Sequence, residues 1–177
     1  MNSAGKVNMK KNRYLRAGAA LAVPALIAFI ALFLLNQQLL VLSNDSSGEI
    51  RFAKPLRKGE GFSVSYTHSV NKSYVEEYYQ PQEGVIYLIS LRYKSFGAGM
   101  ATEVDTAAGQ TLRYEDGYMI IDGYVVSLPR LVYNVDRVAG FRLHYRGREI
   151  AFHDLEEPGQ ALRLSLAPRW KTLFLAV

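Results

Sequence analysis

A histidine and two adjacent glutamates are the residues best placed to carry chemistry. His68 follows one apolar-rich run, and Glu76 and Glu77 lie in the next. Imidazole and carboxylate groups act together as metal ligands or as a general acid–base pair. Because successive side chains of a strand point to opposite faces, at most one of the two glutamates shares a face with His68. One histidine with one carboxylate is an incomplete zinc site, since catalytic zinc takes three protein ligands.

Three interpretations of this region stay open. A metal site would need His68, one glutamate and a further ligand such as His144 or His153. A serine hydrolase would need a serine, a histidine and an acid in the right geometry, and the sequence contains no Gly-x-Ser-x-Gly elbow. A structural hydrogen bond or ion pair between neighbouring strands is the third possibility. The serines near His68 are Ser65, Ser69 and Ser73.

A glycine-rich stretch, Ser95-Phe96-Gly97-Ala98-Gly99-Met100, follows a strongly β-forming run. Two glycines at this spacing permit left-handed backbone or the close approach of another chain. The third glycine of a dinucleotide fingerprint and the Gly-Lys-Ser/Thr of a phosphate-binding loop are both missing. The stretch is therefore either a tight strand exit or a loop that meets a ligand or partner, with Phe96 and Met100 as candidate anchors.

Short strands must position these residues. From Leu39 onward, runs rich in Val, Ile, Tyr and Phe are broken by Gly, Asn, Asp and Pro. About ten such strands predict an all-β domain over residues 39–177, either an antiparallel β-sandwich or a partly open β-barrel. No amphipathic helix is expected after Leu42. The predicted strands are 39–43, 49–53, 61–68, 74–80, 85–93, 110–114, 118–121, 131–135, 140–145, 148–153 and 161–166.

The strand register of one predicted hairpin can be checked against the side chains that it places opposite one another. With Arg146-Gly147 at the turn, Leu143 faces Ile150 on one side and His144 faces Glu149 on the other. An apolar pair on one face and a charge-compatible pair on the other is the arrangement that cross-strand contacts stabilise. A slip of one residue would turn the apolar side chains outward, so the pattern predicts this register.

The N-terminal region predicts a membrane anchor. Residues 17–35 carry no charge and, at about 1.5 Å per helical residue, are long enough to span a bilayer core. The basic residues 1–16 before them favour a cytoplasmic N-terminus and an extracytoplasmic domain. A cleaved signal is disfavoured, because the apolar run is long and lacks an Ala-x-Ala site. The expected location is the cell membrane, with a single pass and a periplasmic or cell-surface domain.

Charge and cysteine content exclude several classes of protein. The whole net charge of +5 comes from cations that precede residue 17, so the remaining chain is neutral. A neutral domain lacks the electrostatic footprint of a nucleic-acid-binding protein. The absence of cysteine excludes disulfides, thiolate metal sites and a cysteine nucleophile. No cofactor is expected.

Several motifs carry a family resemblance. The patterns Tyr-x-His-Ser-Val at 66–70, Val-Glu-Glu-x-Tyr at 75–79, Ser-Phe-Gly-Ala-Gly-Met at 95–100 and Leu-Pro-Arg-Leu at 128–131 resemble the bacterial domain of unknown function family numbered 1850. The resemblance runs from about Leu39 to the C-terminus. Tyr74 and Ala101 stand where the family pattern has proline, which puts local loop geometry in question.

The resemblance implies an association with TRAP transporters of the TAXI class, which are ion-coupled importers of organic acids. It implies a small accessory protein encoded beside, or fused to, the membrane subunits, and it assigns no activity. The expected partners are the transporter membrane subunits or the solute receptor. Our first hypothesis is therefore a non-enzymatic, membrane-anchored interaction domain. The alternatives are a metal- or small-ligand-binding domain using His68 with Glu76 or Glu77, and a Ser/His hydrolase. The candidate residues are His68, Ser69, Glu76, Glu77, Phe96, Gly97, Gly99 and Met100.

Overall fold

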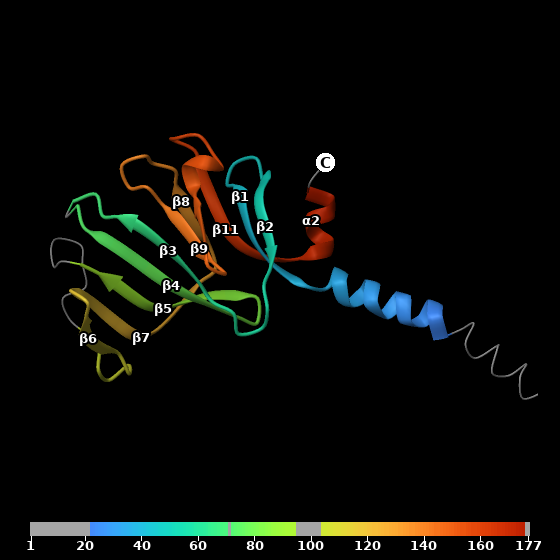
Figure 1. The fold of residues 1–177 in the computed structure, drawn as a ribbon, viewed down its shortest axis with the longest axis horizontal. Coiled ribbons are helices and arrows are strands. Elements are labelled where there is room, and N and C mark those ends of the chain that lie inside the picture. The colour runs from blue at the N-terminus through green and yellow to red at the C-terminus, as the bar shows by residue number, and fades with distance from the viewer. Residues whose placement is uncertain (1–21, 71, 95–103, 176–177) are drawn as a thin grey trace, which may run out of the picture. The chain divides into compact units, whose positions relative to one another are not determined.

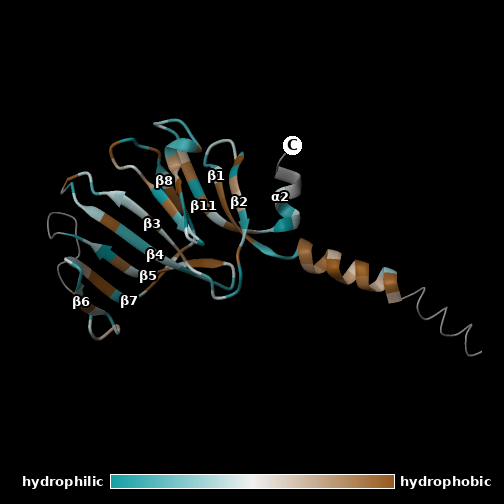
Figure 2. Ribbon diagram, in the orientation of Figure 1, coloured by the Kyte–Doolittle hydropathy of each residue, from teal (hydrophilic) through white to brown (hydrophobic). Residues whose placement is uncertain are grey.

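The computed structural model describes residues 22–70, 72–94 and 104–175, and these fall into two compact units, one that ends at Gln37 and one that begins at Gln38. In the first unit, residues 22–35 form a helix whose surface is almost wholly apolar (Figure 2). Its large side chains are exposed, among them Phe29 and Phe33. Within the described ranges, no helix has the length and apolar character needed to cross a membrane. Residues 17–21 of the predicted anchor lie outside those ranges.

The second unit is built from eleven described strands in two antiparallel sheets (Figure 1). The smaller sheet has the order β2-β1-β11-β8, and the larger has the order β10-β9-β3-β4-β5-β7-β6. The strands are β1 (Gln38–Asn44), β2 (Ile50–Pro55), β3 (Phe62–Thr67), β4 (Tyr74–Gln82), β5 (Val85–Tyr93), β6 (Thr111–Glu115), β7 (Tyr118–Leu128), β8 (Leu131–Asn134), β9 (Arg142–Tyr145), β10 (Arg148–Ala151) and β11 (Ala161–Pro168).

Apolar side chains from both sheets form the main core. Leu40 of β1 and Leu164 of β11 come from the smaller sheet, and Val64 of β3 and Leu143 of β9 come from the larger. Each is at most 2% exposed, so alternate positions of these strands are fully removed from water. Two sheets packed over one core form a sandwich and not a closed barrel, which agrees with the first of the two predicted architectures.

The predicted hairpin is confirmed. In the β9–β10 pair, Leu143 lies opposite Ile150, and His144 lies opposite Glu149. Arg146 and Gly147 both have positive φ, 50° and 67°, as a two-residue turn that matches strand twist requires.

Three predictions about the elements were wrong. The strand expected at 118–121 continues as β7 to Leu128, because Gly123 does not end it but bends it, with φ of 86°. A short helix, α2 (Arg169–Leu175), follows Pro168, although no helix was expected there. Seven residues are too few to show a helical period in the sequence. The strand predicted to reach 153 ends at Ala151, and a 3₁₀ turn, η1 (Phe152–Asp154), follows it.

Candidate functional site

The outward face of the larger sheet carries mainly polar side chains, and we refer to it as the polar face. Val64, Tyr79 and Leu143 point into the core, so the residues beside them in each strand point outward. Outward residues on neighbouring strands are aligned in rows that cross all seven strands. One row is Glu149, His144, Ser63, Tyr78, Ser90, Asp122 and Thr111. The next is Ala151, Arg142, Ser65, Glu76, Arg92, Ile120 and Arg113.

Glu76 lies at the centre of this face and is only 8% exposed. Ser63 Oγ donates to Glu76 Oε1 at 2.6 Å, and the Tyr74 hydroxyl donates to Oε2 at 2.9 Å. Burial and the hydrogen bond to Glu76 raise the pKa of Tyr74, so this hydroxyl stays protonated and remains a donor. A buried carboxylate needs such donors, since burial without hydrogen bonds is costly.

A serine, a histidine and a glutamate are also aligned on this face. Ser65 Oγ lies 2.7 Å from His144 Nε2, and His144 Nδ1 lies 3.9 Å from Glu149 Oε2. The order of groups is that of a hydrolase triad, but the second distance is too long for a hydrogen bond. Ser65 is 2% exposed, so its hydroxyl is closed to a substrate. The contacts join β3, β9 and β10, and we assign them a structural role.

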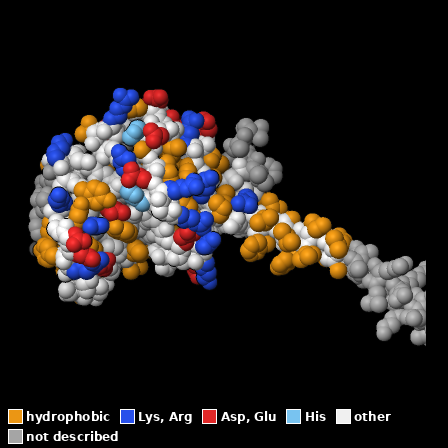
Figure 3. All heavy atoms as spheres, viewed as in Figure 1, with side chains coloured by type: hydrophobic (Ala, Val, Ile, Leu, Met, Phe, Trp, Pro, Cys, Tyr) orange, Lys and Arg blue, Asp and Glu red, His pale blue; other side chains and the backbone are white. Residues whose placement is uncertain are grey.

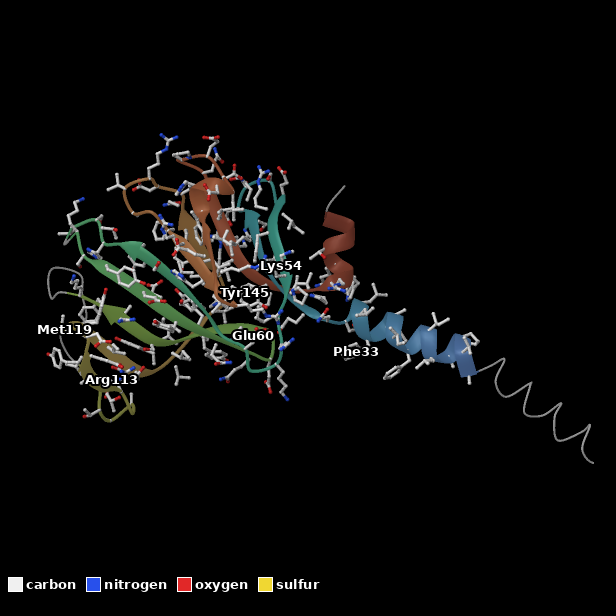
Figure 4. The ribbon with its side chains drawn as sticks, viewed as in Figure 1. Phe33, Lys54, Glu60, Arg113, Met119 and Tyr145 are labelled. Atoms are coloured by element: carbon white, nitrogen blue, oxygen red, sulfur yellow. The ribbon has the colours of Figure 1, made fainter. Side chains whose placement is uncertain are left out.

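A pocket of about 450 Å³ opens on the polar face near β6 and β7. The guanidinium of Arg92 lies 4.0 Å from the centroid of the Tyr118 ring and is hydrogen-bonded to Tyr78. Arg113 (labelled in Figure 4) pairs instead with Asp122 at 2.8 Å and with Glu115. The pocket is lined by Tyr78, Ile89, Ser90, Arg92, Arg113, Glu115, Asp116, Ile120 and Asp122.

Glu77 points to the opposite face of β4, as alternation predicts. Its carboxylate accepts hydrogen bonds from the hydroxyls of Tyr79 at 2.5 Å, Tyr133 at 3.1 Å and Tyr66 at 3.3 Å. Burial, and then the nearby Glu77 charge, raise the pKa of Tyr79. Burial, followed by Tyr79 and then Glu77, raises the pKa of Tyr133, so both hydroxyls remain donors. Tyr133 belongs to β8 of the smaller sheet, so Glu77 links the two sheets.

The remaining predicted residues do not join this site. His68 directly follows β3, where its N–H donates to Ser73 O at 2.8 Å and its Nδ1 accepts from the Val70 N–H at 3.3 Å. Ser69 is exposed on the same turn. In the described part of the chain, no group of three or more His, Asp and Glu side chains could hold a metal ion. Phe96, Gly97, Gly99 and Met100 lie outside the described residues.

Sequence reasoning missed Arg92, and it weighed His144 and Ser65 only as partners of His68. The sequence contains a signal for this face, because polar residues occupy every second position in parts of three predicted strands. These residues are Ser63 and Ser65, Glu76 and Tyr78, and Ser90 and Arg92. That alternation predicts a polar outward face on each strand. It does not show that the strands are neighbours.

Fold and site together define an antiparallel β-sandwich with a hydrogen-bonded polar sheet face. A family model described as domain of unknown function DUF1850 matches residues 62–152, and the chain belongs to this family. The matched region contains all seven strands of the larger sheet, whereas β1, β2 and β11 lie outside it. No curated protein and no solved structure gives a significant match.

Proposed function

We propose that this protein is a membrane-anchored, extracytoplasmic interaction module and that the polar face is its contact surface. One observation carries the choice of surface. The family match begins at the first residue of β3 and ends just after β10, so it contains every strand that builds the polar face. Three of the four strands of the smaller sheet lie outside the match. The region that defines the family is therefore the sheet that carries this face.

The N-terminal region supports the anchor. The uncharged run 17–35 follows five cations, a distribution that favours retention of the N-terminus in the cytoplasm. The described part of this run is a helix with exposed Leu26, Ile27 and Phe29, which membrane lipid would cover. Anchoring would confine the domain to one surface and raise its effective concentration beside a membrane partner.

The family resemblance points to TRAP transporters of the TAXI class as the source of that partner, either a membrane subunit or the solute receptor. The chemistry of the polar face supports a polar contact. Arg113, Arg142 and Glu149 are exposed there with both signs of charge interspersed, and Figure 3 shows the same mixture on the face in view. Such surfaces set the specificity and rate of association.

Crosslinked recovery from native membranes tests this proposal. The full-length protein with a C-terminal tag should stay in the membrane fraction after an alkaline carbonate wash. After mild crosslinking and solubilisation, mass spectrometry should identify transporter subunits in the tagged fraction. Release by carbonate would contradict the anchor, and recovery of the tagged protein without any transporter subunit would contradict the partner.

Two arginines provide a matched comparison of surfaces. Arg113 on β6 and Arg163 on β11 are half-exposed, and each is paired with an aspartate, Asp122 and Asp45 respectively. Arg113→Glu should lower the recovery of partner several-fold, because it reverses a charge on the polar face. Arg163→Glu should leave recovery close to that of the parent. Equal loss in both variants would contradict the assignment of the contact to the polar face.

A further inference from the structure

Arg92 lines the pocket on the polar face, and within the described part of the chain one of its donor atoms is unpaired. Its Nε is buried, and among the described residues this atom has no hydrogen-bond partner. The described ion pairs include none for Arg92, although Arg113 in the same pocket has two. A buried donor without a partner is uncommon in folded proteins and calls for an explanation. The guanidinium stacks on the neighbouring Tyr118 ring, is hydrogen-bonded to Tyr78, interacts with the Glu76 charge and lines the pocket.

The charges around the pocket are arranged unevenly. Glu115 and Asp122 share Arg113, and Asp116 is exposed at the tip of the β6–β7 turn. The three acids outnumber Arg113, so the side of the pocket formed by β6, its turn and Asp122 of β7 is net acidic. Arg92 supplies positive charge on β5, and the Tyr78 hydroxyl beside it on β4 is hydrogen-bonded to Glu76. The pocket therefore presents opposite charges on two sides.

We propose that this pocket binds a small zwitterion of the amino-acid class, which carries a carboxylate beside an ammonium group. The carboxylate pairs with the guanidinium of Arg92, whose planar fork suits two carboxylate oxygens. The ammonium group lies toward Glu115 and Asp116, where a plain dicarboxylate would be repelled. The volume of about 450 Å³ is within the range of small-molecule sites. This inference goes beyond the interaction module and does not depend on the anchor or on the partner.

Calorimetric titration of the full-length protein in detergent micelles tests the site. The probes are the twenty common L-amino acids, with propionate and ethylamine as molecules that carry one of the two charged groups. At least one amino acid should saturate with a Kd of about 1 mM or tighter, and both single-group probes should bind at least about tenfold more weakly. Failure of every amino acid to saturate would overturn the proposal, as would propionate binding as tightly as the best amino acid.

Variants locate the binding in this pocket. Arg92→Lys keeps the charge but loses the planar fork, so it should weaken binding at least about tenfold. Arg163→Lys, on the smaller sheet, should leave binding unchanged. Asp116→Asn, at an exposed turn with φ of 51° that asparagine tolerates, should weaken binding several-fold by removing a charge near the ammonium group. If Arg92→Lys does not fold, the affinity of Asp116→Asn alone tests whether the amino acid binds in this pocket. An affinity equal to that of the parent protein in either folded variant would overturn the assignment.

Discussion

At the scale of the residue, Glu76 and Glu77 show how one strand gives adjacent identical side chains different roles. Glu76 is held on the polar face by Ser63 and Tyr74, whereas Glu77 joins the two sheets through Tyr133. Their opposite orientation could be predicted, because side chains alternate along a strand. Their partners could not. Tyr133 lies 56 residues from Glu77 in the sequence, and only the packing of the two sheets brings them together.

The ion pair between Glu60 and Arg146 should make stability depend on pH. Arg146 Nε lies 2.5 Å from Glu60 Oε1 and its second nitrogen lies 2.6 Å from Oε2, so the contact is bidentate. Hydrogen bonds from Arg146 lower the pKa of Glu60 from 4.5 to about 2. A lowered pKa in the folded state contributes stability above pH 4.5, and this contribution is lost as the pH falls from 4.5 towards 2. The labels in Figure 4 show that Glu60 lies near Tyr145, which precedes Arg146.

Urea unfolding between pH 2 and 7 measures this contribution. Glu60→Gln should lower the free energy of unfolding at pH 7 by about 1 kcal/mol, the upper end for an exposed pair. The difference from the parent protein should disappear as the pH approaches 2. Glu83→Gln, at the exposed turn between β4 and β5, serves as the control and should leave the profile unchanged. A constant difference at all pH values would show that the ion pair is not responsible.

At the scale of the element, local pairing could be predicted but strand order could not. The β9–β10 register follows from a two-residue turn and the alternation beside it, both of which are visible in the sequence. The pairing of β9 with β3 places Ser63 opposite His144 and creates the Ser65–His144 contact. These residues come from distant parts of the chain, and no turn fixes their register. The individual strands of the polar face could therefore be predicted from the sequence, but the order in which they lie side by side could not.

The bend in β7 depends on Gly123. Its φ is 86°, and a Cβ at this position would lie 2.4 Å from the carbonyl oxygen of Gly109. Gly123→Ala should therefore combine backbone strain with a steric clash. Gly48 provides a matched control, because its φ is 76° and nothing lies within 4 Å of a Cβ there.

Comparison of the two alanine variants isolates the clash. Gly123→Ala should lower the free energy of unfolding by about 2 kcal/mol more than Gly48→Ala, since both share the backbone strain and only Gly123 adds a clash, and overpacking of this kind costs about 1–3 kcal/mol. Urea midpoints of the full-length protein in micelles would measure the difference. Equal effects in the two variants would mean that β7 can move away from Gly109 at little cost.

At the scale of the whole molecule, the chain divides into parts that differ in charge and packing. The charge excess is confined to the N-terminal residues, and the rest of the chain is neutral. The larger sheet, which defines the family, has one face in the core and one polar face. The smaller sheet closes the core from the other side. This division is why we assign the contact with a partner to the polar face.

Site-specific photocrosslinking in native membranes tests that assignment most directly. A photoreactive residue in place of Thr111, exposed on the polar face, is compared with one in place of Lys54, exposed on β2 of the smaller sheet. Our account predicts a crosslink from position 111 to a TRAP-type transporter subunit and none from position 54. A crosslink to such a subunit from position 54 alone, or none from either position while the protein stays in the membrane, would contradict it.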